Sequence, residues 1–488
     1  MKRILSKAIY PLLAGACLRM AMVLKFPADA GDAGMYEQLA TNWLKHGKYA
    51  MDIGGQAVPV DLRMPGYPAF LALVYTLTGR TGESARLAVM LAQVVVDLAG
   101  CVVIAALAGL LVSLCSRQVN RGRTFLIGLW LAALCPFTAN YVAVPLTEVW
   151  ATLLTAAALV ILVMLAAEVR GEGREWPRRE WVSGKGYWRW VVLAGFVVGL
   201  GTLFRPEAPL LLGTSLVLLG LWMWWRGETK RFVKTAALMV CACVVPLAPW
   251  IARNAVTLRE FQPLAPKDTM LPGELNPKGF MAWERTWLFR VRDCYLVPWR
   301  LNDDEIHLEE IPAEAFDTAE ERERVAAVLE VYNDDLTLTK EEDEVFAQLA
   351  RERTARHPLR TYVWIPLRRA VRIWFTPRIE LLPVSGHVFP LGYMSEEDPF
   401  DQRVTIVIFF LNILYVGLGM WGGWKLWKCR RSRAAVVLLV FYMVVRTAFL
   451  TALETPEPRY VLECFPAILA MGAAVFVRMK EGVSEVGK

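Results

Sequence analysis

The chain has 488 residues, of which 56% are hydrophobic and 21% are charged. Soluble domains contain about 45–50% apolar residues, and here the excess falls in long runs such as 87–114 and 190–203. A run of about 20 apolar residues forms a helix that crosses a bilayer. The composition therefore excludes an ordinary soluble protein and predicts an all-α polytopic membrane protein.

The formal net charge is +7, and the basic residues gather in short loops between the apolar runs. This arrangement indicates membrane topology rather than nucleic-acid binding, so the lipid bilayer is a predicted partner and nucleic acid is not. By length and apolar content we predict roughly ten spanning helices. They lie near 5–25, 84–114, 124–141, 146–168, 190–204, 207–225, 233–251, 404–424, 434–453 and 461–478.

With an even number of spans, the basic loops and both termini share one side, which the positive-inside rule makes the cytoplasm. Two long segments then lie on the outer side. We predict an N-terminal transmembrane module at 1–253 that contains the first outer loop at 26–83. An extracytoplasmic domain follows at 254–403, and C-terminal transmembrane helices follow at 404–488.

The extracytoplasmic domain is predicted to be mixed and mainly helical. The residue patterns at 320–331 and 340–356 predict amphipathic helices, and the acidic runs between them are typical of a solvated surface. The segment 362–375 interleaves apolar residues with Arg368, Arg369 and Arg372. That composition is typical of a helix that lies in the membrane interface.

The nine cysteines show neither a disulfide framework nor a zinc-ligand spacing. No metal-ligand residues are predicted. The sequence indicates no definite cofactor and leaves open whether a divalent metal ion takes part.

The first outer loop carries a short helical pattern. Its apolar face is formed by Tyr36, Leu39, Ala40, Trp43 and Leu44. Asp32 lies near the start of this helix, where the helix N-terminus favours a negative charge. Asp32 could serve there as a helix N-cap or as a reactive carboxylate. Pro65 and Pro68 stiffen the return of the chain into the membrane.

Charged residues recur at the outer ends of the predicted spans. Charges at that depth are costly unless they are paired or hydrated, and they often mark a functional site. Asp97 instead lies in the middle of the second predicted span, where a structural hydrogen bond between helices is expected. The residues at the outer ends include Asp29, Asp32, Asp61, Arg63, Glu148, Arg205, Glu207, Arg253, Glu454, Glu457 and Arg459.

The order of these residues resembles the GT-C glycosyltransferases, in the branch of protein O-mannosyltransferases and the lipid A aminoarabinose transferase. That branch carries an Asp-x-x-x-Tyr motif after the first helix and a basic residue before a Pro-rich return. Matching motifs are Asp32 with Tyr36, Arg63-Met64-Pro65-Gly66-Tyr67-Pro68, Thr147-Glu148, Arg205-Pro206-Glu207, Pro249-Trp250 with Arg253-Asn254, His357-Pro358 and Glu457-Pro458-Arg459-Tyr460. Ala33 departs from the Asp-Glu pair of many protein O-mannosyltransferases, which weakens the case for a protein acceptor.

The resemblance implies a glycosyltransferase at the outer face of an inner or plasma membrane, facing the periplasm or exterior. It would move a sugar, with inversion, from a polyprenyl-phosphate donor to an envelope acceptor such as a glycolipid, a polysaccharide or a protein. Asp32 would be the catalytic base, and Glu148 a second catalytic residue that orients the acceptor or holds an arginine. The donor phosphate would contact Arg63, Arg205 and Arg459. The substrates would contact Asp29, Tyr36, Tyr67, Glu207 and Arg253, with Asp29 the second candidate for the base.

Three other functions fit parts of the sequence. A membrane transporter would place charges near the bilayer midplane, where Asp97 and Arg446 are the relevant residues. An O-antigen-ligase-like enzyme would use a polyprenyl-diphosphate donor and lack the Asp-x-x-x-Tyr loop. A structural membrane subunit with a degenerate site would not need Asp32, Arg63 and Glu148 together.

Overall fold

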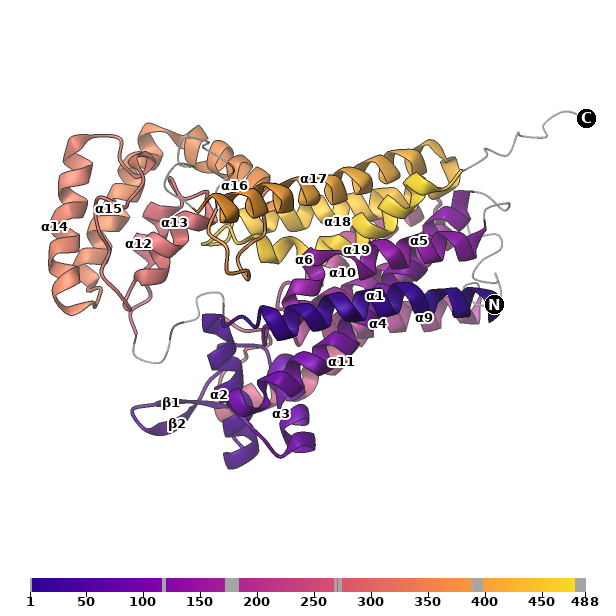
Figure 1. Ribbon diagram of the computed structural model, residues 1–488, viewed down its shortest axis with the longest axis horizontal. Coiled ribbons are helices and arrows are strands. Elements are labelled where there is room, and N and C mark those ends of the chain that lie inside the picture. The colour runs from indigo at the N-terminus through magenta and orange to yellow at the C-terminus, as the bar shows by residue number, and fades with distance from the viewer. Residues whose placement is uncertain are drawn as a thin grey trace, which may run out of the picture. The chain divides into compact units, whose positions relative to one another are not determined.

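The computed structural model describes residues 2–115, 120–171, 184–266, 270, 274–386, 388 and 398–478. The chain divides into two compact units. Unit 1 comprises 1–266, 377–443 and 462–488, and unit 2 comprises 267–376 and 444–461. The described residues are mainly helical (Figure 1), which confirms the predicted architecture. The predicted domains at 1–253, 254–403 and 404–488 follow membrane sidedness and stay a prediction.

Seven helices in the described residues are long and apolar enough to cross a membrane. They correspond to seven of the predicted spans, with small shifts at their ends. The helices are α1 (Lys2–Lys25), α4 (Arg86–Cys115), α7 (Glu148–Arg170), α11 (Thr229–Thr257), α17 (Pro399–Lys428), α18 (Arg433–Thr451) and the segment Pro458–Phe476, which contains η8 (Pro458–Cys464), α19 (Phe465–Gly472) and η9 (Ala473–Phe476).

The other three predicted spans are helical but depart from a simple crossing. The predicted span at 124–141 is α5 (Arg121–Ala133) followed by α6 (Pro136–Ala139) and η2 (Asn140–Ala143), with a bend of 53°. Pro136 begins the second helix, because proline cannot continue the preceding one. The predicted hairpin consists of α9 (Lys185–Thr202) and α10 (Pro209–Trp224), and α10 has only 16 residues. A count of ten spans stays a prediction.

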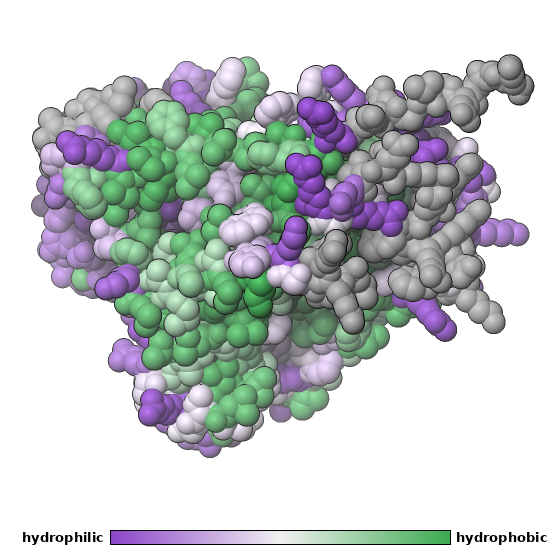
Figure 2. All heavy atoms as spheres, turned by 45° about the vertical axis from the view of Figure 1, so that its right-hand side comes forward, coloured by the Kyte–Doolittle hydropathy of each residue, from purple (hydrophilic) through white to green (hydrophobic). Residues whose placement is uncertain are grey.

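Large hydrophobic side chains are exposed along several of these helices. Figure 2 shows one face of the chain on which such residues are widespread. Surface of this kind suits contact with lipid tails rather than with water. Exposed examples are Leu91 and Val95 of α4, Val240 and Val244 of α11, and Val407 and Phe410 of α17.

A buried ion pair joins the first spans of unit 1. Arg19 of α1 donates a hydrogen bond of 2.5 Å to Asp97 of α4, and it also donates to the carbonyl oxygen of Ala133 at 2.7 Å. Both side chains are almost fully buried. The predicted helix-to-helix role of Asp97 is therefore confirmed, with Arg19 as the partner. A charge committed to such a contact is poorly suited to carry a transported substrate.

The first outer loop contains α2 (Gly31–His46), a hairpin of β1 (Ala50–Ile53) and β2 (Gln56–Pro59), and α3 (Gly66–Thr78). The predicted helix is confirmed, and Tyr36, Leu39 and Ala40 are buried. Trp43 and Leu44 of the same predicted face are exposed. The antiparallel hairpin was not predicted, and residues Ala50 to Ile53 pair with Pro59 to Gln56.

Unit 2 packs short helices around an aromatic core. Its elements are α12 (Lys278–Glu284), α13 (Val291–Leu296), η3 (Pro298–Arg300), η4 (Ala313–Ala315), α14 (Ala319–Asp335), α15 (Lys340–Arg356), η5 (Arg360–Trp364) and α16 (Ile365–Trp374). The predicted helices at 320–331 and 340–356 correspond to α14 and α15. The core includes Phe280, Trp283, Trp287 and Phe346, whose rings make edge-on and tilted contacts.

The predicted interfacial helix is η5 followed by α16, but its middle arginine is not at a surface. Arg369 is only 2% exposed. Its guanidinium donates to the carbonyl oxygens of Leu288 at 2.7 Å and Leu453 at 2.6 Å. It therefore ties three segments of unit 2 together. Contact with the membrane interface, as predicted for this helix, would involve only the exposed side of α16.

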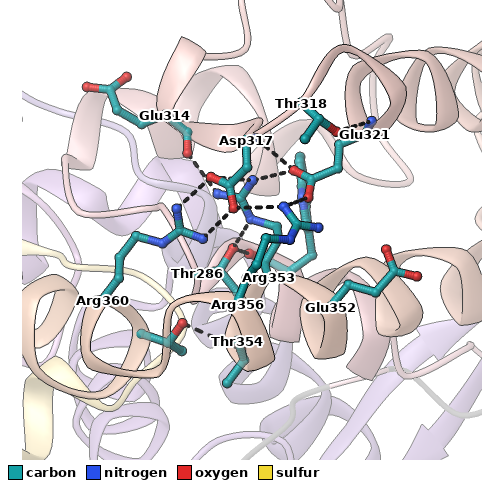
Figure 3. Close-up of polar contacts among 12 residues, drawn as sticks. Thr286, Glu314, Asp317, Thr318, Glu321, Glu352, Arg353, Thr354, Arg356 and Arg360 are labelled. Carbon is teal, nitrogen blue, oxygen red and sulfur yellow. Dashed lines mark hydrogen bonds and ion pairs between the residues drawn. The ribbon is translucent and has the colours of Figure 1, made fainter.

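A network of charged residues connects α14, α15 and η5 (Figure 3). Arg353 is fully buried and donates to Glu321 at 2.6 Å. Arg360 donates to both carboxylate oxygens of Asp317, at 2.5 and 2.8 Å, and Arg356 pairs with Glu321 at 2.7 Å. Burial opposes ionisation of the two carboxyls. The hydrogen bonds and charges around them outweigh burial, so the pKa of Asp317 and the pKa of Glu321 lie below their ordinary values.

The stability of unit 2 is therefore expected to depend on pH. A carboxyl whose pKa is lowered by folding stabilises the folded state above its unfolded pKa, about 4 for these groups. That contribution is lost as the pH falls through the lower, folded pKa. We expect hydrogen exchange in α14 and α15, corrected for intrinsic rates, to accelerate between about pH 5 and pH 3. Asp317→Asn should weaken this dependence, and an unchanged pH profile in that variant would contradict the assignment.

Candidate active site

Asp32 and Arg63 meet in unit 1. Arg63 donates from Nη2 to Oδ1 of Asp32 at 2.7 Å, and both side chains are half-buried, 18% and 24% exposed. Asp32 is the second residue of α2, where the positive end of the helix dipole favours its ionised form. The N-cap is Ala30. The alternative that Asp32 serves as the N-cap is therefore wrong. An N-cap at Asp32 would start the helix at residue 33, whereas α2 starts at Gly31.

Tyr36 stands one helical turn after Asp32 and packs edge-on against Tyr67, with ring centroids 5.1 Å apart. Burial, reinforced by the negative charge of Asp32, raises the pKa of Tyr36 to about 12. The positive charges of Arg63 and Arg205 oppose this rise, and Glu148 adds to it. Tyr36 is thus protonated near neutral pH. Its pKa depends on the charges of both Arg63 and Arg205.

Tyr67 is fixed by the protein itself. Its hydroxyl donates to Oε1 of Gln93 at 2.7 Å. Gln93 in turn donates to the carbonyl oxygens of Val142 at 3.1 Å and Val144 at 2.9 Å. The ring of Tyr67 therefore supports Tyr36 from a rigid position, while its hydroxyl links α3 and α4 to the segment at 142–144 that follows α6.

Arg205 lies in the turn between α9 and α10 and faces three carboxylates. It approaches Glu207 at 3.0 Å, Glu463 at 3.3 Å and Glu148 at 3.4 Å. All four side chains are at most 12% exposed. Glu148 opens α7 and Glu463 lies just before α19, so this single arginine collects acids from three separate elements.

A backbone contact joins the two arginine-bearing segments. The N–H of Gly66, three residues after Arg63, donates to the carbonyl oxygen of Leu203 at 2.7 Å, two residues before Arg205. A Cβ at Gly66 would lie 2.6 Å from that oxygen. No side chain fits at that distance, which explains why the return of the first loop carries glycine between Pro65 and Tyr67.

Two further predicted residues are held in local contacts of unit 1. Arg253 of α11 donates to the carbonyl oxygens of Tyr49 at 2.6 Å and Val60 at 2.8 Å, so it fastens the β1–β2 hairpin to the helix. Asp29 is 69% exposed and approaches Arg86 at 3.3 Å. Arg86 also binds Glu37 through Nε at 2.7 Å and Nη2 at 3.1 Å.

Arg459 belongs to unit 2. It pairs with Glu457, which also accepts a hydrogen bond of 3.0 Å from the hydroxyl of Tyr460. Arg446 of α18 donates to the carbonyl oxygen of Tyr460 at 3.1 and 3.0 Å. A backbone carbonyl is therefore one partner of Arg446, which again does not favour a transport pathway.

Sequence reasoning missed Glu37, Arg86 and Glu463. A usable signal existed for Glu463, because a carboxylate inside the predicted span at 461–478 is costly and often functional. Among the described residues, no group of three or more His, Cys, Asp or Glu side chains is placed to hold a metal ion.

No family model matches the chain, and no curated protein matches it. Solved structures do align with it. The archaeal oligosaccharyltransferase AglB from Archaeoglobus fulgidus, in complex with an inhibitory peptide and a dolichol-phosphate, has a TM-score of 0.47 and 13% identity, over 96% of this chain and 50% of that chain. ArnT from Cupriavidus metallidurans bound to undecaprenyl phosphate has a TM-score of 0.42 and 13% identity, over 95% of this chain and 77% of that chain. The present chain thus spans about half the length of the archaeal protein.

Proposed function

We propose that the chain is a GT-C membrane glycosyltransferase that moves a sugar from a polyprenyl-phosphate donor to an envelope acceptor. The observation that carries the proposal is the ion pair between Asp32 and Arg63, beside Tyr36 and the Arg205 group. It brings a carboxylate for the acceptor proton and an arginine for the phosphate into direct contact. The resemblance in the sequence supplies the class of donor.

The transfer needs a base and a positive charge at the leaving group. The acceptor oxygen attacks the anomeric carbon, the bond from that carbon to the phosphate oxygen breaks, and the sugar is inverted. Asp32 takes the acceptor proton, and Arg63 stabilises the charge on the departing phosphate. Glu148 and Glu207 hold Arg205 in place, and Tyr36 offers a protonated hydroxyl to the substrates.

The ion pair also suggests the order of events. A carboxylate bound to an arginine is a weak base, because the positive charge stabilises its ionised form. A donor phosphate that binds Arg63 competes with Asp32 for the guanidinium. Phosphate binding therefore releases the base at the moment when the acceptor needs it.

The proposed orientation places this site at the periplasmic or exterior face of the inner or plasma membrane. The opposite end of α4 lies against the turn between α17 and α18, since Cys115 contacts Ser432. Basic residues of both segments therefore gather at one end of unit 1, which supports the cytoplasmic assignment of that end. They are Arg121, Arg123, Lys425, Lys428, Arg430, Arg431 and Arg433. Arg117, the basic residues within 172–183 and Lys480 lie outside the described residues.

The role of Arg63 can be tested by direct binding of the carrier. In lipid nanodiscs, Arg63→Ala is expected to weaken binding of polyprenyl monophosphate about ten- to hundredfold, the effect of removing a hydrogen bond to a charged group. Native mass spectrometry measures this binding. Arg80→Ala, which alters an exposed arginine of the same loop, is the matched control. Equal affinity in both variants would remove Arg63 from the donor site.

The same measurement separates the proposal from its nearest alternative. An O-antigen-ligase-like enzyme would prefer a polyprenyl diphosphate. Tighter, Arg63-dependent binding of the diphosphate would therefore favour that alternative. Comparison of cell-envelope glycans by mass spectrometry, with and without the gene, identifies the sugar and the acceptor.

A further inference from the structure

Two cysteines that the proposed reaction does not use lie together in unit 1. Cys115 ends α4, and Cys429 is the residue between α17 and η7 (Arg430–Ser432). The thiol of Cys429 donates to the carbonyl oxygen of Cys115 at 3.6 Å, and Sγ of Cys115 lies 3.0 Å from Oγ of Ser432. Both cysteines are reduced and half-buried. A small oxidant can therefore reach them.

The surroundings of Cys429 favour a thiolate. Cys429 immediately precedes the helical segment Arg430–Thr451. When Cys429 is deprotonated, the Cys115 thiol and the backbone N–H groups of Arg431 and Ser432 donate to its sulfur and stabilise the negative charge. Burial opposes this effect but does not cancel it, so the pKa of Cys429 lies below its ordinary value. Thiolates at helix N-termini beside basic residues are the reactive cysteines of proteins.

Ser432 fixes the arrangement. Its hydroxyl donates to the carbonyl oxygens of Leu426 at 2.5 Å and Cys429 at 3.1 Å. The hydroxyl is itself buried and in contact with the Cys115 thiol. Ser432 thus holds the Cys115 thiol beside the turn that carries Cys429, so a second cysteine lies next to the reactive one, as is common in redox-sensing cysteines.

We propose that Cys429 and Cys115 are a peroxide-sensitive pair that closes to a disulfide between α4 and the turn joining α17 to α18. The Cys429 thiolate attacks a hydroperoxide oxygen, and with one proton this gives the sulfenic acid and an alcohol, or water from hydrogen peroxide. The Cys115 thiol then attacks the sulfenic sulfur, forms the disulfide and releases water. The two sulfurs lose two electrons in total, and the peroxide gains them.

The pair is remote from the proposed active site. The 30 residues of α4 separate Cys115 from Arg86, which contacts Glu37, and a helix of that length measures about 45 Å. In the proposed orientation the pair faces the cytoplasm. The redox chemistry of the pair uses neither Asp32 nor Arg63, so its test is independent of the proposed function.

The test uses the full chain in nanodiscs, treated with hydrogen peroxide, alkylated, digested and analysed by mass spectrometry. The expected product is one intramolecular Cys115–Cys429 peptide pair that dithiothreitol reverses. Cys115→Ser should leave a sulfenic acid at Cys429, which dimedone traps. Cys429→Ser should abolish both products. A disulfide between two copies of the chain, or peroxide sensitivity that survives Cys429→Ser, would overturn the proposal.

Reactivity without oxidant gives a second measurement that does not depend on disulfide formation. At pH 7, Cys429 is expected to react with iodoacetamide about tenfold faster than the thiol of a short unstructured peptide, whose pKa is ordinary. The rate should rise with pH around a midpoint below the ordinary thiol pKa of about 8.5. Equal rates for Cys429 and the peptide thiol, in protein that elutes as a folded monodisperse species, would contradict the assignment.

Discussion

Asp32→Asn is expected to lower the rate of sugar transfer by about 10²–10⁴-fold, the range typical for removal of a general base. Asparagine has nearly the same shape, but it cannot accept the acceptor proton. The substitution also frees Arg63 from its carboxylate partner at 2.7 Å. Binding of polyprenyl monophosphate should therefore be kept or strengthened while turnover is lost. Single-turnover transfer and carrier binding are measured on the same preparation. The first checks the loss of turnover, and the second checks that the carrier still binds.

Asp29→Asn is the matched control for that experiment. Asp29 lies three residues earlier and is largely exposed, and its nearest cation is Arg86 at 3.3 Å. Exposed pairs of this kind contribute about 0–1 kcal/mol, so only a small change in rate is expected. A large loss in Asp29→Asn together with an active Asp32→Asn would transfer the role of base to Asp29. Loss of carrier binding in Asp32→Asn would contradict the competition for Arg63.

Arg205→Met is expected to cost both activity and stability. It would leave Glu148, Glu207 and Glu463 facing one another without their shared cation. Removing one partner of a buried ion pair costs about 3–5 kcal/mol. Thermal unfolding in detergent, followed by circular dichroism, measures the loss of stability.

Arg226→Met is the control for Arg205→Met. Arg226 pairs with Glu228 at 3.0 Å, but its side chain is 50% exposed. Its removal should change stability by less than about 1 kcal/mol. Similar losses in the two variants would show that the three acids do not depend on Arg205.

The sequence was sufficient for the long elements because each has a strong periodic or continuous apolar signal. The spans α4, α7 and α11 follow from apolar length, and α14 and α15 follow from helical periodicity. The hairpin of β1 and β2 was missed because each strand has only four residues. The break between α5 and α6 was also missed. Pro136 marks it, but proline inside an apolar run is compatible with a kinked span.

The candidate site could be predicted only in part. The motif order led to Asp32, Arg63, Glu148, Arg205 and Glu207, and the structure of unit 1 brings each of them into an ion pair. The pairing itself was not predictable, because a sequence does not state which distant segments meet. Glu463 was overlooked although a carboxylate within an apolar span is a signal, and Arg86 lies at the border between a loop and a span. Arg253 was predicted to contact the substrates, but its guanidinium donates hydrogen bonds to the backbone carbonyls of Tyr49 and Val60.

The backbone hydrogen bond between Gly66 and Leu203 makes the spacing of this site independent of its charged side chains. The spacing between the Arg63 segment and the Arg205 turn is set by main-chain atoms, which no side-chain exchange at 63 or 205 removes. Natural variation could therefore alter the charges that meet the sugar and the acceptor while the scaffold kept its dimensions. Related chains with different substrates would then be expected to keep the glycine and diversify the ionic residues around it.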